Sequence, residues 1–216
     1  TTGSNNVALG TFALSSDDLG TENTAVGYNT LSALNFATAT TSYNTAVGAR
    51  AGEAVTTGIR NTLLGGLAGD ALQDADDNVA VGQQSLSSDT LGSGAVAIGH
   101  NALFSQNFTT ATTNYNVAIG YKTGEAVTTG VQNTIVGGLA GDALTVGQNN
   151  VVMGVAALSS DVGGSRTVAI GRGALEAQNQ GSSDTNAHNT AIGYGAGASV
   201  TTGKHVTIVG ALAGDA

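Results

Sequence analysis

The chain has no cysteine, proline or tryptophan among its 216 residues, and only 10% of the residues are charged. Without cysteine it has no disulfide, no thiolate metal site and no cysteine nucleophile. The lack of proline excludes a collagen helix, and an aromatic content of 4% excludes a core built on large rings. Its 6 basic and 15 acidic residues give a net charge of −9, the wrong sign for binding a phosphate backbone. We therefore expect no nucleic-acid partner.

Long apolar runs are missing as well, since no stretch of about 18 apolar residues occurs. We expect no insertion into a membrane. The chain opens on Thr1-Thr2-Gly3 instead of an initiator methionine and a basic, apolar signal segment. We therefore expect it to be a fragment of a longer fibrous protein.

What the sequence does contain is a repeat rich in glycine. The unit is Asn, then Thr or Val, then Ala, an aliphatic residue and Gly, as in Asn23–Gly27. Most units recur at the interval that separates Gly10 from Gly27, and one interval in every four is longer, as from Gly27 to Gly48. Twelve units therefore form three super-repeats of four units, at residues 1–72, 73–144 and 145–216. The glycines that close the units are Gly10, Gly27, Gly48, Gly65, Gly82, Gly99, Gly120, Gly137, Gly154, Gly171, Gly193 and Gly210.

A period of about 17 residues, with one short strand and several glycine turns in each unit, predicts a parallel β-solenoid. We expect an all-β fold, a β-roll of twelve coils of about 17 residues that forms a single repeat domain over residues 1–216. Helical repeats have periods of about 33–47 residues and do not fit.

The two faces of each strand differ in composition. Adjacent residues of a strand point to opposite sides. The residue before the closing glycine is aliphatic in all twelve units, so we assign it to the core. The residue before that is Ala in eight units, so we assign it to a close-packed surface between chains.

The energetics of one coil favour association between chains. Ordering about 17 residues costs about 17–34 kcal/mol of backbone entropy. One coil offers roughly four aliphatic or alanine positions, each worth at most about 1.5–3 kcal/mol when buried. We therefore expect a homo-oligomer, with the alanine side of the strands as the interface.

Particular repeats resemble those of known fibrous proteins. Asn23–Leu31 and Asn189–Tyr194 resemble the repeats of bacteriophage tail fibres, and Val96–Gly99, Val117–Gly120 and Val168–Gly171 are similar to the head repeats of trimeric autotransporter adhesins. The resemblance implies a left-handed β-roll, a homotrimer, a role in adhesion and a location on a virion tail fibre or a cell surface. The period of this chain is longer than that of the adhesin heads.

The residue types that carry catalysis are sparse. The three histidines fall at unrelated phases of the repeat, and no paired acid or nucleophile stands beside them in the sequence. We expect no enzymatic activity and no cofactor.

Carboxylates recur in phase with the repeat, and we expect them to form a solvated acidic face. Calcium requires six to eight oxygen ligands from a clustered set. The one dense cluster of acids is Asp74, Asp76 and Asp77, and no calcium-binding loop motif accompanies it. We predict no metal site.

The asparagine that heads the unit occurs in nine of the twelve copies. The exceptions are Ala95, Thr167 and Val206. A fixed phase predicts an internal ladder of side-chain amides that hydrogen-bond from coil to coil, as stacked asparagines do in cross-β structures. The alternative is a polar ladder at the surface that binds a ligand.

Each super-repeat carries one long loop, at residues 35–43, 107–115 and 179–188. Binding residues concentrate in loops held by rigid scaffolds. Two of these loops combine a Phe and a Tyr with Thr and Asn, which suits stacking and hydroxyl contacts to sugars. The alternative is that Phe36 and Phe108 close the end of a long turn. The predicted ligand-binding residues are Phe36, Thr40, Tyr43, Phe108, Thr112, Tyr115, Asp184 and His188.

These observations favour a homotrimeric fibre or adhesin segment that attaches to a glycan or receptor on a host or cell surface. Two alternatives remain. One is a purely structural spacer of a fibre. The other is an ice-binding solenoid, which a flat surface rich in Thr, Ala and Gly with few charges also suits, although Thr alternates with Val and leaves no unbroken threonine row.

Overall fold

The computed structural model describes residues 3–215 and confirms a parallel β-solenoid of about twelve coils, with no helix among these residues. The length of each coil also agrees with the sequence period, since hydrogen bonds repeatedly join a residue to its equivalent one period earlier, as from Asn61 to Asn44. The chain divides into two compact units. Unit 1 comprises Thr1–Asn101 and Asn107–Asn114, and unit 2 comprises Ala102–Gln106 and Tyr115–Ala216. The boundary between the units falls inside the second super-repeat, at the long loop 107–115.

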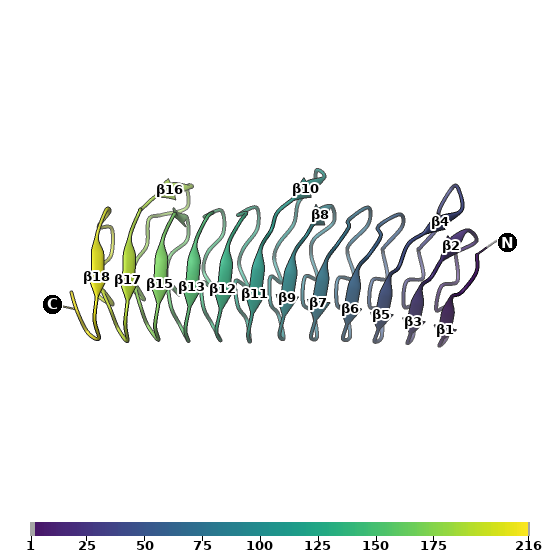
Figure 1. Cartoon of the computed structure of the whole chain (residues 1–216), viewed down its shortest axis with the longest axis horizontal. Helices are drawn as coiled ribbons and strands as arrows, with labels where there is room; N and C mark the ends of the chain where they lie inside the picture. Colours follow the sequence, from purple (N-terminus) through teal and green to yellow (C-terminus); the bar gives the residue numbers. More distant parts are fainter. Residues whose placement is uncertain (1–2, 216) are drawn as a thin grey trace. The chain divides into compact units, whose positions relative to one another are not determined.

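Unit 1 contains one main sheet of short parallel strands, one strand from each coil (Figure 1). Equivalent positions of successive coils pair with one another, as Ala8 does with Ala25, and the register is kept across a long loop, where Ala25 pairs with Ala46. Two small parallel sheets line the loop side, formed by β2 (Gly20–Thr21) with β4 (Thr40–Thr41) and β8 (Gly92–Ser93) with β10 (Thr112–Thr113). The main strands are, in order, β1 (Val7–Leu9), β3 (Thr24–Val26), β5 (Thr45–Val47), β6 (Thr62–Leu64), β7 (Val79–Val81) and β9 (Val96–Ile98).

Unit 2 repeats this arrangement (Figure 1). Its long loop 179–188 also adds a strand, β16 (Thr185–Asn186), which pairs with β14 (Gly164–Ser165). The main strands are, in order, β11 (Val117–Ile119), β12 (Thr134–Val136), β13 (Val151–Met153), β15 (Val168–Ile170), β17 (Thr190–Ile192) and β18 (Thr207–Val209).

The two faces of the main strands are the reverse of those predicted. The middle residue of each strand, which is alanine in most coils, points inward, and Ala25 and Ala97 are fully buried. The aliphatic residue before the closing glycine points outward, and Val47 and Ile119 remain 39% and 38% exposed. The prediction that the alanine side lies at the surface is therefore wrong.

The interior of the coil explains the reversal. Four residues after the closing glycine, leucines such as Leu31, Leu86 and Leu103 fill the interior from the wall that faces the strand, and all three are fully buried. These leucines hold φ values near +50°, a conformation that favours glycine. They leave room for only a methyl group on the strand, so the larger aliphatic residues are on the outside.

Two coils of each super-repeat use glycine where the others use leucine, and the strand compensates. A Cβ added at Gly52 would lie 2.7 Å from Cδ1 of Leu63, and one added at Gly69 would lie 2.8 Å from Cδ2 of Leu63. Leu63 replaces alanine in β6 and is fully buried. One leucine on the strand therefore fills the space that two glycines on the facing wall leave open.

Candidate functional site

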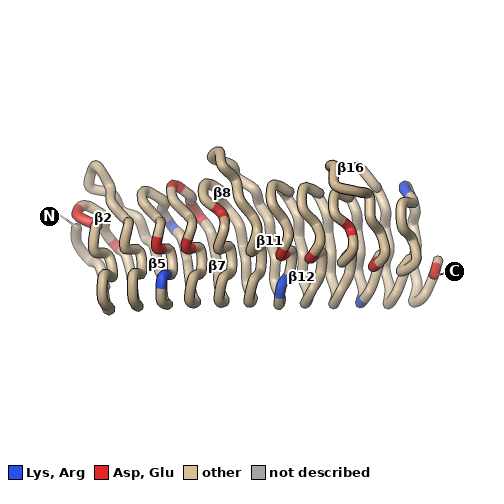
Figure 2. Tube along the Cα trace, turned by 180° about the vertical axis from the view of Figure 1, so that it is seen from behind, with Lys and Arg blue, Asp and Glu red and all other residues tan. Residues whose placement is uncertain are grey.

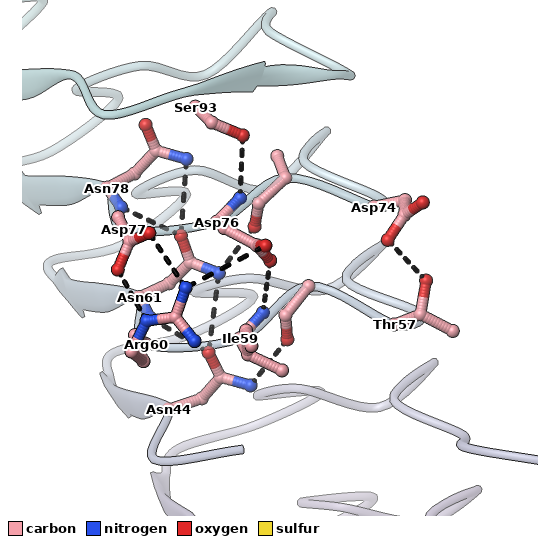
Figure 3. Close-up of polar contacts among 12 residues, drawn as sticks. Asn44, Thr57, Ile59, Arg60, Asn61, Asp74, Asp76, Asp77, Asn78 and Ser93 are labelled. Atoms are coloured by element: carbon pink, nitrogen blue, oxygen red, sulfur yellow. Dashed lines mark hydrogen bonds and ion pairs between the residues drawn. The ribbon is translucent and has the colours of Figure 1, made fainter. Parts of the chain in front are cut away.

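The leading asparagines form an internal ladder, which confirms that prediction. The Nδ2 atom of Asn61 donates to the carbonyl oxygen of Ala75 at 2.7 Å, and its Oδ1 accepts from the backbone N–H of Asn78 at 3.1 Å (Figure 3). Asn44, Asn61 and Asn78 are fully buried, so the alternative of a surface binding ladder is wrong for them.

The ladder is interrupted before each long loop, and Val206 is a further interruption that no long loop follows. All of the laddered asparagines except Asn23 donate from Nδ2 to a backbone carbonyl at the equivalent point of the next turn, as Asn44 does to Gly58. Asn23, Ala95 and Thr167 head the strands that directly precede the three long loops, where the inserted residues displace that carbonyl. Nδ2 of Asn23 is buried without a hydrogen-bond partner among the described residues. Ala95 and Thr167 avoid such an unpaired amide.

Two acids of the dense cluster each bind a separate neighbour on the preceding coil. Oδ1 of Asp74 accepts from the hydroxyl of Thr57 at 2.8 Å, and Oδ1 of Asp76 accepts from the backbone N–H of Ile59 at 2.8 Å (Figure 3). These hydrogen bonds join equivalent positions of successive coils. The two carboxylates therefore reinforce the stacking of the coils.

The third acid, Asp77, forms a two-bonded ion pair with Arg60 at 2.6 and 2.8 Å (Figure 3). The hydrogen bond from Arg60 holds the pKa of Asp77 below its ordinary value. No group of three or more His, Cys, Asp or Glu side chains in residues 3–215 is arranged to hold a metal ion. The cluster is a set of bonded pairs along the stack.

A second acidic pair occupies neighbouring coils of unit 1. Glu53 accepts hydrogen bonds from Arg50 at 2.5 Å and Asn29 at 2.9 Å. Burial raises the pKa of Glu53, but these two hydrogen bonds outweigh burial and hold the pKa below its ordinary value. Burial raises the pKa of Asp70, which accepts a hydrogen bond from the hydroxyl of Ser87. One carboxyl with a lowered pKa and one with a raised pKa could divide acid and base roles, but the part of the chain that the structure describes contains no pocket around them.

Two of the recurring acids anchor the long loops. Asp89 was expected on a solvated face, but it is fully buried, and its Oδ1 accepts from the backbone N–H groups of Gly92 at 3.1 Å and Phe108 at 2.9 Å. Asp161 is also fully buried, and its Oδ1 accepts from the backbone N–H groups of Gly164 at 3.1 Å and Gln180 at 3.0 Å. The expectation of a solvated face is wrong for these two residues, because backbone donors of the loop need a buried acceptor.

The first super-repeat lacks one part of this anchor. Oδ2 of Asp161 accepts from Nε2 of Gln178 at 2.6 Å, whereas Leu34 occupies the position of Gln178 in the first super-repeat. Oδ2 of Asp17, the equivalent carboxylate, is consequently buried without a hydrogen-bond partner among residues 3–215.

The aromatic residues of the long loops separate into buried and exposed positions. Phe36 and Phe108 are each only 6% exposed, so their rings close the interior of the loops, as the alternative interpretation predicted. Tyr43 and Tyr115 are 60% and 62% exposed. The predicted pairing of a Phe and a Tyr on one binding surface is therefore not present in the loop that contains both Phe36 and Tyr43.

Tyr43, Tyr115 and His188 occupy equivalent corners, two residues before β5, β11 and β17. All three are exposed and have φ values of 52–53°. The ring of His188 stacks on that of His205 in the next coil, with centroids 5.1 Å apart and planes 22° apart. The expectation that these two histidines fall at unrelated phases is wrong, because Val206 replaces the asparagine that marks the phase after His205.

Two of the remaining predicted residues bond within their own loops, and Asp184 bonds to preceding coils. The hydroxyl of Thr40 donates to the carbonyl of Thr38 at 2.9 Å, and that of Thr112 donates to the carbonyl of Thr110 at 3.0 Å. The carboxylate of Asp184 is exposed and accepts from Nε2 of Gln148 at 2.6 Å and from a serine hydroxyl. These contacts hold the loops in shape.

Comparison of the chain with protein-family models, with curated protein sequences and with solved structures finds no match. Among the described residues, no helix could span a membrane.

Proposed function

We propose that the chain is a structural segment of a fibre on a virion or a cell surface, in which the solenoid holds other parts of the fibre at a set separation. The observation that carries this proposal is the use of polar groups for stacking. The asparagine ladder, the Arg60–Asp77 pair and the buried Asp89 all join one coil to its neighbours. Three chains, the number implied by the resemblance to adhesin heads, would run side by side.

The absence of a concave site among residues 3–215 supports the same function. Ligand sites of enzymes and binding proteins are usually preformed pockets with a few converging polar groups. Here the polar groups converge on the next coil instead. A spacer needs only a fold that can be lengthened one repeat at a time, since each coil contacts only its neighbours.

Deletion of one whole super-repeat tests the proposal. Removal of residues 73–144 joins equivalent points of the repeat, so the ladder and the leucine–glycine pattern continue across the junction. We expect a folded protein with the same circular dichroism per residue and a cooperative melt. The matched control deletes residues 73–136, which shifts the phase by about half a coil, and we expect it to unfold. Unfolding of the in-phase variant would overturn the proposal.

Attachment to a surface is a second candidate, and the exposure of Tyr43, Tyr115 and His188 at equivalent corners favours it. Aromatic rings stack on sugars, and a net charge of −9 favours a neutral partner over an anionic one. The partner would be a glycan or receptor on the host or cell surface.

Paired tyrosine variants test this candidate. Tyr43→Ala with Tyr115→Ala should reduce binding to a glycan array and to host cells without changing the melting temperature. Tyr28→Ala with Tyr194→Ala is the matched control, because these two tyrosines are 51% and 52% exposed and follow the closing glycines at the other ends of main strands. Equal binding by both variants would exclude the corners from attachment and leave the spacer function intact.

A further inference from the structure

The outward face of the main strands carries no charge in either unit. The first and third residues of every main strand point outward, and all of them are Thr, Val, Leu, Ile or Met. All Asp, Glu, Lys and Arg residues lie on turns and loops outside the main strands (Figure 2). With a net charge of −9 on the chain, this separation leaves a surface in each unit from which charge is excluded.

Side chains on this face are exposed although they are large and apolar. Val47, Ile119 and Ile192 are 38–39% exposed, and Met153 is 42% exposed. Their equivalents on six other strands are half-buried, because the columns they form cover one another, whereas Leu9 on β1 and Val209 on β18 are 67% and 68% exposed. The largest apolar patch on a monomeric protein is typically about 300–600 Å² and is often functional.

We propose that this outward face packs against the same face of other copies of this chain. The columns of aliphatic side chains repeat with the spacing of the strands, about 4.8 Å. A partner must present ridges with the same spacing over several coils to fill the grooves between them. A second copy of the solenoid necessarily has that spacing, since its strands pair in the same register. An unrelated globular surface would match it over one or two coils only.

The face of one unit supplies about a third of the area of a standard interface. Six strands at about 4.8 Å and three residues at about 3.3 Å give a footprint of roughly 290 Å² in each unit. Each chain carries one such face in each of its two units. A standard interface takes about 800 Å² from each partner.

Charge placement favours the same arrangement. Burying Val, Ile and Thr side chains against their equivalents requires no desolvation of an ion. The acidic residues stay outside the contact, where they repel one another between copies, and salt screens that repulsion. We therefore expect association to strengthen as the salt concentration rises. The inference rests on the proposed function in one respect, because a fibre of several chains needs a surface that holds them together.

Sedimentation equilibrium and light scattering test the inference on the full chain. The wild type should have a mass that is a multiple of 21.0 kDa, three times that value for a trimer. The test variant carries one glutamate on the third main strand of each super-repeat, through Val47→Glu, Ile119→Glu and Ile192→Glu. The control carries the same added charge on exposed loop tips, through Thr38→Glu, Thr110→Glu and Ser183→Glu.

We expect the face variant to be monomeric and the loop control to keep the mass of the wild type, with the same circular dichroism in both. Each glutamate buried without a partner should weaken association by roughly 100-fold or more. A monomeric wild type, or a face variant that keeps its oligomeric mass, would overturn the inference. Either result would leave the spacer function standing, because that function depends on the folding of the in-phase deletion. Thermal hysteresis in a monomeric wild type would instead assign the face to ice.

Discussion

The adjacent leucines of β6 provide a direct test of which side of the main strands forms the core. Leu63 is fully buried between the two glycine turns, and Leu64 points outward and is half-buried. We predict that Leu63→Ala strongly lowers the free energy of unfolding and that Leu64→Ala lowers it little. The two variants remove the same atoms one position apart, so each is the control for the other.

The expected magnitudes follow from the surroundings of Leu63. Leucine-to-alanine changes in cores cost about 2–5 kcal/mol, and the cost rises with the volume of cavity that remains. Gly52 and Gly69 carry no side chain with which to close the space around Leu63. We therefore expect about 4 kcal/mol for Leu63→Ala. Leu64→Ala should cost about 1 kcal/mol, because only part of its surface is removed from water.

Refilling the cavity from the opposite wall sharpens the test. Gly69→Leu alone should destabilise the protein, because the new Cβ would lie 2.8 Å from Cδ2 of Leu63. Combined with Leu63→Ala, it recreates the arrangement of Ala25, Leu31 and Leu34 in the coil of β3, where Leu34 holds the position that Leu72 holds here. We expect the double variant to recover at least half of the stability that Leu63→Ala loses.

Urea unfolding monitored by circular dichroism measures these differences. The variants are best made in the background of the face variant, so that contacts between copies do not contribute to the stability. A loss for Leu64→Ala equal to or greater than that for Leu63→Ala would refute the assignment of the core. Independent, additive losses from Leu63→Ala and Gly69→Leu would refute the compensation between strand and turn.

Three further changes probe the ladder, a buried carboxyl and a loop. Asn61→Ala should lower the free energy of unfolding by about 2–4 kcal/mol, because a backbone carbonyl and a backbone N–H lose their partner. In the same urea titration, the control Asn35→Ala, at an exposed loop position, should lower it by less than about 0.5 kcal/mol. Burial raises the pKa of the Asp142 carboxyl above its ordinary 3.8, so the folded state binds this proton more tightly than the unfolded state does. The stability therefore falls as the pH rises from about 3.8 through the pKa of the folded state. Asp142→Asn should remove that fall between about pH 4 and 7 and raise the stability at about pH 7. Phe108→Ala should cost about 3–5 kcal/mol in thermal or urea unfolding, because the ring fills the interior of its loop, and a cost below about 1 kcal/mol would show that the ring is dispensable there.

The solenoid, the length of its coils and the asparagine ladder could all be predicted from the sequence. Each depends on a position that recurs at a fixed phase of the repeat, such as that of Asn61 or that of the closing Gly27. Stacking in register turns a repeated residue into a column, so a polar residue that recurs in phase must be paired within that column or exposed along all of it. The predicted long loops and their extra residues also follow from the spacing alone.

The candidate binding residues could be predicted less well. Phe36 and Tyr43 belong to the same loop and have similar chemistry, but one is buried and the other exposed. Whether an aromatic side chain fills a loop or extends from it depends on the backbone path, which Asp89 fixes in the second super-repeat through hydrogen bonds. The recurrence of Asp17, Asp89 and Asp161 after two serines marks a fixed phase in the sequence, but it does not say whether the carboxylate is buried or solvated.

The sequence by itself determined the number of coils, the phase of each residue within its coil and the positions that must be small. Which side of the strand faces inward was decided only by the tertiary structure. An alternation of period two identifies two faces but does not say which one is enclosed. The enclosing wall settles this, because Leu31, Leu86 and Leu103 occupy the interior from the turn after the closing glycine and leave space for a methyl group on the strand. Where Gly52 and Gly69 replace them, the same limited volume admits Leu63.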